Sequence, residues 1–205
     1  RDTGLKSSFM ALGGRRPEAE GPSHSRKISP CQSRANILVI DDNALNVKLM
    51  KRTIQKLVRG RAQVATAYHG LHAIRELVKL MLGEVPDSRS LAAKDSWKSG
   101  CFEDDDDDVQ ALLLALREAL AVHRRWPVRC ILCDIHMPVM GGVEFVTRLR
   151  KVEVETGLTI PLPVYAVTAT DHRPEIEAIL AAGATGIIKK PFARSDLVSI
   201  FTAIL

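Results

Sequence analysis

The 205-residue sequence is poor in aromatic residues and contains no long apolar run. Aromatic residues make up only 4% of it, and they do not alternate with basic residues as on surfaces that bind nucleic acids. The apolar stretch Ala111–Leu116 is far shorter than the roughly 18 residues that a membrane span needs, and the N-terminus lacks a secretory signal. We therefore expect a cytoplasmic segment that contacts neither nucleic acid nor membrane, although a longer parent chain could carry a membrane anchor.

The sequence also lacks a strong charge of either sign beyond its first 35 residues. The formal net charge is +5, but the first 35 residues hold seven Lys and Arg against three acidic residues, which leaves a surplus of one for the rest. Residues 1–34 are rich in Gly, Ser, Pro and Arg and show no strand or helix period, which predicts a flexible linker. Because the chain begins at Arg1, we expect it to be part of a longer polypeptide.

Cysteine is scarce as well, with four residues at positions 31, 101, 130 and 133. This pattern does not match the disulfide framework of a small secreted domain and favours a reduced, intracellular setting. Cys130 and Cys133 have the spacing of a redox or zinc motif, but they fall in a predicted strand, where residues three apart point to opposite faces. We therefore expect both thiols to pack in the core.

What the sequence does contain is a regular alternation of apolar strands and amphipathic helices. Strands are predicted at 37–40, 62–67, 128–133, 164–167 and 185–189, and helices after Asn43, over 70–82, from about 143, over 173–182 and over 196–205. This alternation predicts an α/β domain over 35–205, with a doubly wound, five-stranded open parallel sheet and helices on both faces.

An insertion at about 83–126 interrupts the alternation before the third strand. Its first part, with five consecutive aspartates up to residue 108, has the composition of a solvated loop. The stretch 109–123 is strongly helical, and we expect it to pack onto the domain as an extra helix. Trp97 and Trp126 flank the insertion and are expected to anchor it.

Local signals place the caps and the buried face of individual helices. Asn43 is the expected N-cap of the first helix, and Asp171 that of the helix over 173–182, which Gly183 ends. Four apolar residues recur at near-helical spacing in the first helix and predict its inner face: Leu45, Leu49, Ile54 and Leu57.

Four of the five predicted strands are followed by polar or charged residues. These residues are Asp41 and Asp42, Asp134, Thr168 and Lys190. A single aspartate at such a place is commonly the cap of the next helix. The ligand site of an open parallel sheet, however, lies outside the carboxyl ends of its strands. Because these residues follow strands one, three, four and five, we interpret them as one shared site.

The residue types of this site indicate phosphoryl chemistry. Three crowded carboxylates repel one another unless a cation lies among them, and Mg²⁺ prefers a few carboxylates, water and a phosphate oxygen. The absence of an added His or Cys cluster argues against zinc. Lys190 offers a positive charge and Thr168 a hydroxyl for phosphoryl oxygens. Asp134 is then the candidate nucleophile, because the adjacent Asp41 and Asp42 are better placed to hold the ion.

The segments ILVIDDN, ILCDIHMPVMGG, VTAT and KKPF, in this order, resemble the receiver domain of two-component response regulators. The resemblance covers about residues 36–205 and implies a flavodoxin-like fold with strand order 2-1-3-4-5. It implies phosphorylation of Asp134, catalytic roles for Thr168 and Lys190, and a cis peptide bond before Pro191. It also implies a set of Mg²⁺ ligands: Asp41, Asp42, Asp134 and the backbone carbonyl of His136.

The stretch Asp41-Asp42-Asn43-x-x-Asn46 is similar to the form found in receivers of hybrid sensor histidine kinases. Because a linker precedes the predicted fold and no output domain follows Leu205, we expect the C-terminal receiver of such a kinase. The phosphoryl donor would be a histidine of the kinase core and the acceptor a histidine phosphotransfer protein. By family analogy, the first helix and the loops around the site are the expected partner surface.

Three features depart from the family pattern: the long insertion, Ile187 in place of an aromatic residue that rotates on phosphorylation, and Gly141 in place of a frequent Asp. We expect a phosphoacceptor rather than an enzyme, although the parent chain would contain a histidine kinase. One alternative is a haloacid dehalogenase-like Mg²⁺-dependent phosphohydrolase, which needs a second acid two residues after the nucleophile, where this chain has His136. A stand-alone response regulator and a scaffold that is never phosphorylated are further alternatives.

Overall fold

The computed structural model of the protein describes residues 35–82 and 106–204. The predicted linker over 1–34 and the loop part of the insertion over 83–105, including Trp97, lie outside the described residues. The strands are β1 (Ala35–Ile40), β2 (Ala62–Ala67), β3 (Val128–Asp134), β4 (Val164–Thr168) and β5 (Gly186–Lys189). The helices are α1 (Ala44–Val58), α2 (Gly70–Leu82), α3 (Asp106–His123), α4 (Gly142–Glu155), α5 (Arg173–Ala181) and α6 (Arg194–Ile204).

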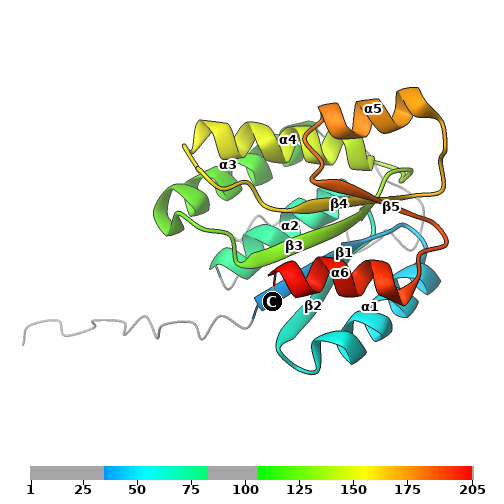
Figure 1. The fold of residues 1–205 in the computed structure, drawn as a ribbon. Coiled ribbons are helices and arrows are strands. Elements are labelled where there is room, and N and C mark those ends of the chain that lie inside the picture. The colour runs from blue at the N-terminus through cyan, green and yellow to red at the C-terminus, as the bar shows by residue number, and fades with distance from the viewer. Residues whose placement is uncertain (1–34, 83–105, 205) are drawn as a thin grey trace, which may run out of the picture. The chain divides into compact units, whose positions relative to one another are not determined.

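The five strands form one parallel sheet in the order β2-β1-β3-β4-β5, as predicted. Helices α1 and α6 cover one face of the sheet, and α2, α4 and α5 cover the other (Figure 1). The apolar runs in β1 and β3 are buried on both faces, which is why they read as continuous rather than alternating hydrophobic sequence. The predicted fold class is therefore confirmed.

The two thiols of β3 lie in different halves of the core. Cys130 packs in the cluster beneath α1 and α6, whereas Cys133 packs in the cluster beneath α2 and α4. Both side chains are fully buried, and neither forms a disulfide. Burial raises the pKa of Cys130 to about 12, and burial together with the charges of Asp134 and Asp41 raises the pKa of Cys133 as well. The prediction that these thiols are packing residues on opposite faces is confirmed.

The predicted inner face of α1 is wrong in part. The face that packs on the sheet consists of Val47, Met50, Ile54 and Val58. Leu45 and Leu49 are instead 69% and 63% exposed. Leu45 lies nine residues before Ile54, which at 3.6 residues per turn is about two and a half turns and therefore the opposite side of the helix. These two leucines project into solvent from the first two turns of α1.

The helix caps are as predicted in α1 but not at the start of α5. The Asn43 side chain accepts hydrogen bonds from the backbone N–H groups of Leu45 and Asn46 at 2.9 and 3.4 Å. The predicted cap Asp171 is wrong, because His172 holds the N-cap position without a side-chain bond and Asp171 forms an ion pair with Lys189. The attraction of this neighbouring ammonium group draws the carboxylate away from the helix end.

The extra helix α3 packs on α2 and α4, as predicted. Val109, Leu112, Leu116 and Leu120 are buried in the same cluster as Leu77 and Phe145. The helix begins at Asp106, so the prediction that all five aspartates belong to the loop is wrong for the last three. Negative charge in the first turn is favoured by the helix dipole, which explains why the acidic run continues into the helix. Among the described residues, none of the helices has the length and hydropathy of a membrane span.

Candidate functional site

The strand register brings the predicted site residues to one edge of the sheet. Ile40 pairs with Cys133, so Asp41 and Asp134 follow at adjacent strand ends. Thr168 follows Val167, the partner of Asp134, and it pairs with the residue before Lys190. The backbone N–H of Lys190 also donates to the Thr168 carbonyl at 2.7 Å. The carboxyl ends of four strands therefore present these side chains along one edge, where open α/β sheets bind ligands.

Three carboxylates form the centre of the site. Asp41, Asp42 and Asp134 each offer an oxygen, and these oxygens all lie within 4.8 Å of one another. Asp41 is fully buried and Asp134 is 8% exposed, whereas Asp42 is exposed. Partial burial raises the pKa of Asp42, and the charges of Asp41 and Asp134 raise it further. The cluster thus carries a repulsion that a bound divalent cation would relieve.

Lys190 bridges two of these carboxylates. Its Nζ lies 3.0 Å from Asp41 Oδ2 and 3.0 Å from Asp134 Oδ2. Burial of the ammonium group acts to lower the Lys190 pKa. Hydrogen bonds to Asp41 and Asp134, together with the negative charges of these two residues, outweigh burial and raise the pKa. The Lys190–Pro191 peptide bond is cis, as the family resemblance implies. The positive charge therefore lies directly beside the predicted nucleophile.

Asp41 is held in place by the start of α1. Its Oδ1 accepts from the Asn43 backbone N–H at 2.9 Å, and both of its oxygens accept from Asn46 Nδ2, at 3.1 and 3.2 Å. Asn46 is not among the predicted site residues. The signal that points to it is an amide one helical turn beyond the Asn43 cap, on the side of α1 that returns toward Asp41.

The loop after β3 closes tightly around Asp134. Asp134 Oδ1 accepts from the Ile135 backbone N–H at 2.8 Å, and the Gly142 N–H donates to the Ile135 carbonyl at 2.9 Å. A Cβ at Gly142 would lie only 2.9 Å from Ile135 Cα, so this close approach requires glycine. Gly141 occupies the N-cap of α4 without a side-chain hydrogen bond. Glycine at position 142 therefore permits the tight loop that follows the predicted nucleophile.

Thr168 and His136 complete the predicted set. Thr168 is buried, and its Oγ1 accepts from the Thr170 backbone N–H at 3.2 Å. The His136 side chain is exposed, and its Nε2 lies 2.9 Å from Glu175 Oε1 on α5. The His136 side chain therefore contacts Glu175 rather than the carboxylate cluster.

Ile187 replaces the aromatic residue that the family resemblance leads one to expect on β5. It is partly buried and packs with Ile135, Ala166 and Ile179 in a small apolar cluster beneath α5. An aliphatic side chain that is packed in this way has no ring to rotate between two positions. Any change that follows phosphorylation must therefore use other side chains.

Comparison with known families identifies the domain. A family profile described as the response regulator receiver domain matches residues 100–202, which is half of the chain. The chain belongs to this family. The matched stretch contains Asp134, Thr168 and Lys190, while Asp41 and Asp42 precede it, directly after β1, the strand that pairs with β3.

The receiver is similar to segments of histidine kinases and to a response regulator. It is 40% identical over 68 residues to the peroxide stress-activated histidine kinase mak3 of Schizosaccharomyces pombe, covering 33% of this chain and 3% of that protein. It is 25% identical over 126 residues to the two-component response regulator ORR41 of Oryza sativa, covering 60% of this chain and 91% of that protein. The chain thus spans only a few per cent of the histidine kinases that it matches.

Solved receiver structures share the fold. The receiver domain of the histidine kinase CKI1 from Arabidopsis thaliana, complexed with Mg²⁺, has a TM-score of 0.55 at 22% identity and covers 83% of this chain and 92% of its own. The receiver domain of sensor histidine kinase PA1611 from Pseudomonas aeruginosa, with a magnesium ion in its active site cleft, has a TM-score of 0.52 at 20% identity, with coverages of 83% and 96%. The receiver fold is that of a phosphoacceptor signalling domain of two-component systems, not of a classical enzyme.

Proposed function

We propose that this receiver, spanning residues 35–205, accepts a phosphoryl group on Asp134 from a phosphohistidine. The observation that carries the proposal is the position of the Asp134 carboxylate. Its Oδ2 lies 3.0 Å from the Lys190 ammonium, and Asp134 belongs to the cluster of three carboxylates. A carboxylate placed between a fixed cation and a metal-binding cluster is suited to attack on a phosphorus atom.

The donor set fits Mg²⁺. Its three carboxylates are hard oxygen ligands that are open to solvent through Asp42, and a magnesium site of this kind retains water. Asp42, Asp134 and the backbone carbonyl of His136 would hold the ion, and Asp41 would assist. When bound, the ion neutralises charge that develops on the phosphoryl oxygens.

The phosphoryl transfer needs only two reacting side chains, the donor phosphohistidine and Asp134. An Asp134 oxygen forms a bond to phosphorus while the bond from phosphorus to the donor histidine nitrogen breaks, and the imidazole leaves with the electron pair and takes up a proton. Lys190 stabilises negative charge on the phosphoryl group, and the Thr168 hydroxyl donates a hydrogen bond to one of its oxygens. The reverse reaction passes the group to a histidine of the next protein.

The partners follow from this chemistry and from the relatives. Hybrid histidine kinases are among the similar proteins, so we propose a kinase core as donor and a histidine phosphotransfer protein as acceptor. The haloacid dehalogenase alternative has no support from the family match. It also lacks its general acid, because the residue two positions after Asp134 is His136 rather than an acid.

Beryllofluoride, which mimics a phosphoryl group on a carboxylate, tests the assignment. We expect the purified 205-residue chain to bind it saturably in the presence of Mg²⁺, as followed by ¹⁹F NMR, and we expect Asp134→Asn to abolish this binding. Substitution of Asp171, an exposed aspartate outside the cluster, by Asn is the matched control and should change nothing.

Unchanged beryllofluoride binding in Asp134→Asn would refute the assignment of Asp134 as the nucleophile. Incubation with radiolabelled, phosphorylated histidine phosphotransfer proteins then tests the direction of transfer. A slowly decaying adduct with one phosphoryl group per chain supports the receiver, whereas repeated turnover of a small phosphate ester would support a phosphohydrolase instead.

A further inference from the structure

A pocket lies where the insertion ends, at the end of strand β3 opposite the phosphoacceptor Asp134. Two segments line this pocket, residues 124–129 at the end of the insertion and residues 158–163 before β4. Val128 in its wall is the first residue of β3, and Asp134 is the last. Six steps along a strand correspond to about 20 Å. A molecule in this pocket would therefore leave the phosphoacceptor site open.

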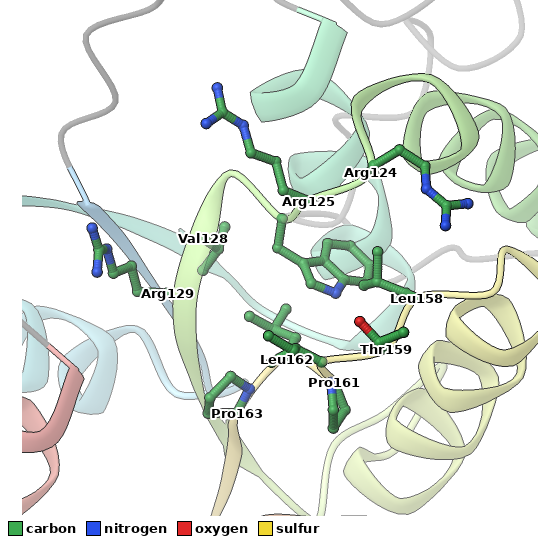
Figure 2. Close-up of a pocket in the computed structure, with 11 residues that line it drawn as sticks. Arg124, Arg125, Val128, Arg129, Leu158, Thr159, Pro161, Leu162 and Pro163 are labelled. Atoms are coloured by element: carbon green, nitrogen blue, oxygen red, sulfur yellow. The ribbon is translucent and has the colours of Figure 1, made fainter.

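The interior of the pocket is apolar and small. Val128 and Leu162 are buried, and Pro161, Pro163 and Leu158 extend the same surface (Figure 2). Ile160 lies at the rim with 78% of its surface exposed. The cavity volume is about 280 Å³, whereas pockets for drug-sized ligands measure roughly 300–1,000 Å³. The space therefore suits one or two apolar side chains rather than a whole cofactor.

Three arginines surround this apolar interior. Arg124, Arg125 and Arg129 are exposed lining residues on different sides of the pocket, and the guanidinium groups of Arg125 and Arg129 extend outward from it (Figure 2). Arg129 Nη1 also donates to the Ile204 carbonyl at 3.3 Å. Arg124 is held in place because its guanidinium donates to the carbonyls of Thr156 and Gly157 at 2.8 and 3.4 Å. Among the described residues that line the pocket, none is acidic. The rim is therefore strongly positive and partly preorganised.

Glu153 lies next to this pocket but does not neutralise it. Glu153 is 3% exposed, and its Oε1 accepts from Trp126 Nε1 at 2.9 Å and from the Leu162 N–H at 2.7 Å. Its Oε2 pairs with Arg150 Nη1 at 2.7 Å, and Arg150 also donates to the carbonyls of Leu162 and Gly183. Glu153 therefore connects the two segments that line the pocket through its hydrogen bonds to Trp126 and Leu162. Its negative charge is compensated by Arg150.

We propose that this pocket docks a linear acidic peptide segment of a partner protein, with one apolar side chain seated among Val128, Leu158 and Leu162 and carboxylates on the arginines. Arginine is suited to this role because its planar guanidinium binds carboxylates through two parallel hydrogen bonds. One part of the pocket wall, formed by Arg124, Arg125 and Trp126, comes from the end of the insertion. The pocket would recruit a partner while Asp134 remains accessible.

The chain's own stretch FEDDDDD, residues 102–108, has the required chemistry in its sequence, an apolar residue followed by carboxylates. It is therefore a suitable probe peptide.

Fluorescence anisotropy with a labelled FEDDDDD peptide tests the proposal on the full chain. We expect saturable binding that the amide peptide FQNNNNN does not show. The double substitution Arg125→Glu with Arg129→Glu should weaken binding by at least about tenfold, because charge reversal places like charges together. Ile160→Ser should weaken it by a smaller factor through the rim of the apolar pocket.

Arg52→Glu on α1 is the matched control, because it makes the same charge change at an exposed site on another helix. It should leave peptide affinity within about twofold, and all variants should retain beryllofluoride binding at Asp134. Equal weakening by Arg52→Glu, or no saturable binding, would overturn the proposal. Self-association in light scattering that the Arg125 and Arg129 substitutions abolish would assign the pocket to a second copy and would also overturn it.

Discussion

At the scale of single residues, Asp41 shows how a fully buried carboxylate is accommodated beside two others. Donors from three places meet it: the Asn43 backbone, the Asn46 side chain and Lys190. A buried charge is tolerated only when it is paired and hydrogen-bonded, so each of these donors offsets part of its desolvation. The predicted nucleophile Asp134 is thereby left with one oxygen bound to the backbone and one facing Lys190.

His69 makes folding stability depend on pH. It is 7% exposed, and its Nδ1 accepts from the His72 backbone N–H at 3.3 Å, which caps the start of α2. Burial, together with the charges of His72 and Arg75, lowers the pKa of His69 from 6.5 to about 4. The folded state thus prefers neutral His69, and this contribution is complete above pH 6.5 and is lost as the pH falls toward 4.

We expect the free energy of unfolding to fall by about 3 kcal/mol over this interval from His69 alone. Urea denaturation at several pH values between 7.5 and 4 measures it. His69→Asn retains a capping side chain without a titrating group and should show a shallower decline. An identical decline in both proteins would show that other groups cause the pH dependence.

At the scale of elements, α1 places two exposed leucines next to the site. Leu45 and Leu49 follow the Asn43 cap by less than two turns, and their exposure is large for apolar side chains. Such a patch marks an interaction surface when it is unpartnered. Leu45→Ser with Leu49→Ser should therefore slow phosphoryl transfer with a histidine phosphotransfer protein by about tenfold or more, because burial of a leucine stabilises a complex by roughly 1.5–3 kcal/mol.

The rate of label transfer from the phosphorylated partner measures this effect. Leu114→Ser on α3 is the control, since Leu114 is also exposed, at 45%, but lies on another helix. Both variants should bind beryllofluoride normally. If the Leu114 substitution slowed transfer as much as the α1 pair, the surface on α1 would lose its assigned role.

At the scale of the whole molecule, long-range order was easier to predict from the sequence than side-chain direction. The alternation of β-branched runs and helical periods fixes an open parallel sheet, and a parallel sheet must bring Asp41, Asp134, Thr168 and Lys190 to one edge. The predicted buried face of α1 is wrong in part because the prediction relied on its leucines, whereas Val47 and Met50 pack on the sheet. Apolar residues on a surface that binds partners cannot be distinguished from core residues by composition.

Contacts between distant segments account for the remaining differences. Asp171 has the sequence of a cap, but Lys189 on β5 attracts it, and no local pattern reveals that pair. The arginine-lined pocket likewise depends on segments that are far apart in sequence. Tertiary electrostatics overrides local preference at these positions.

The placement of Cys130 and Cys133 on either side of the central strand provides a built-in probe of how the molecule opens. With Cys31→Ser and Cys101→Ser as background, only the two buried thiols can react with a disulfide reagent. Because a reagent must pass α1 and α6 to reach one sulfur and α2 and α4 to reach the other, equal labelling rates would mean that both layers detach together. We expect equal rates, and we expect beryllofluoride with Mg²⁺ to slow both alike by mass action. Faster modification of one cysteine, read by mass spectrometry of its peptide, would instead reveal which layer loosens first.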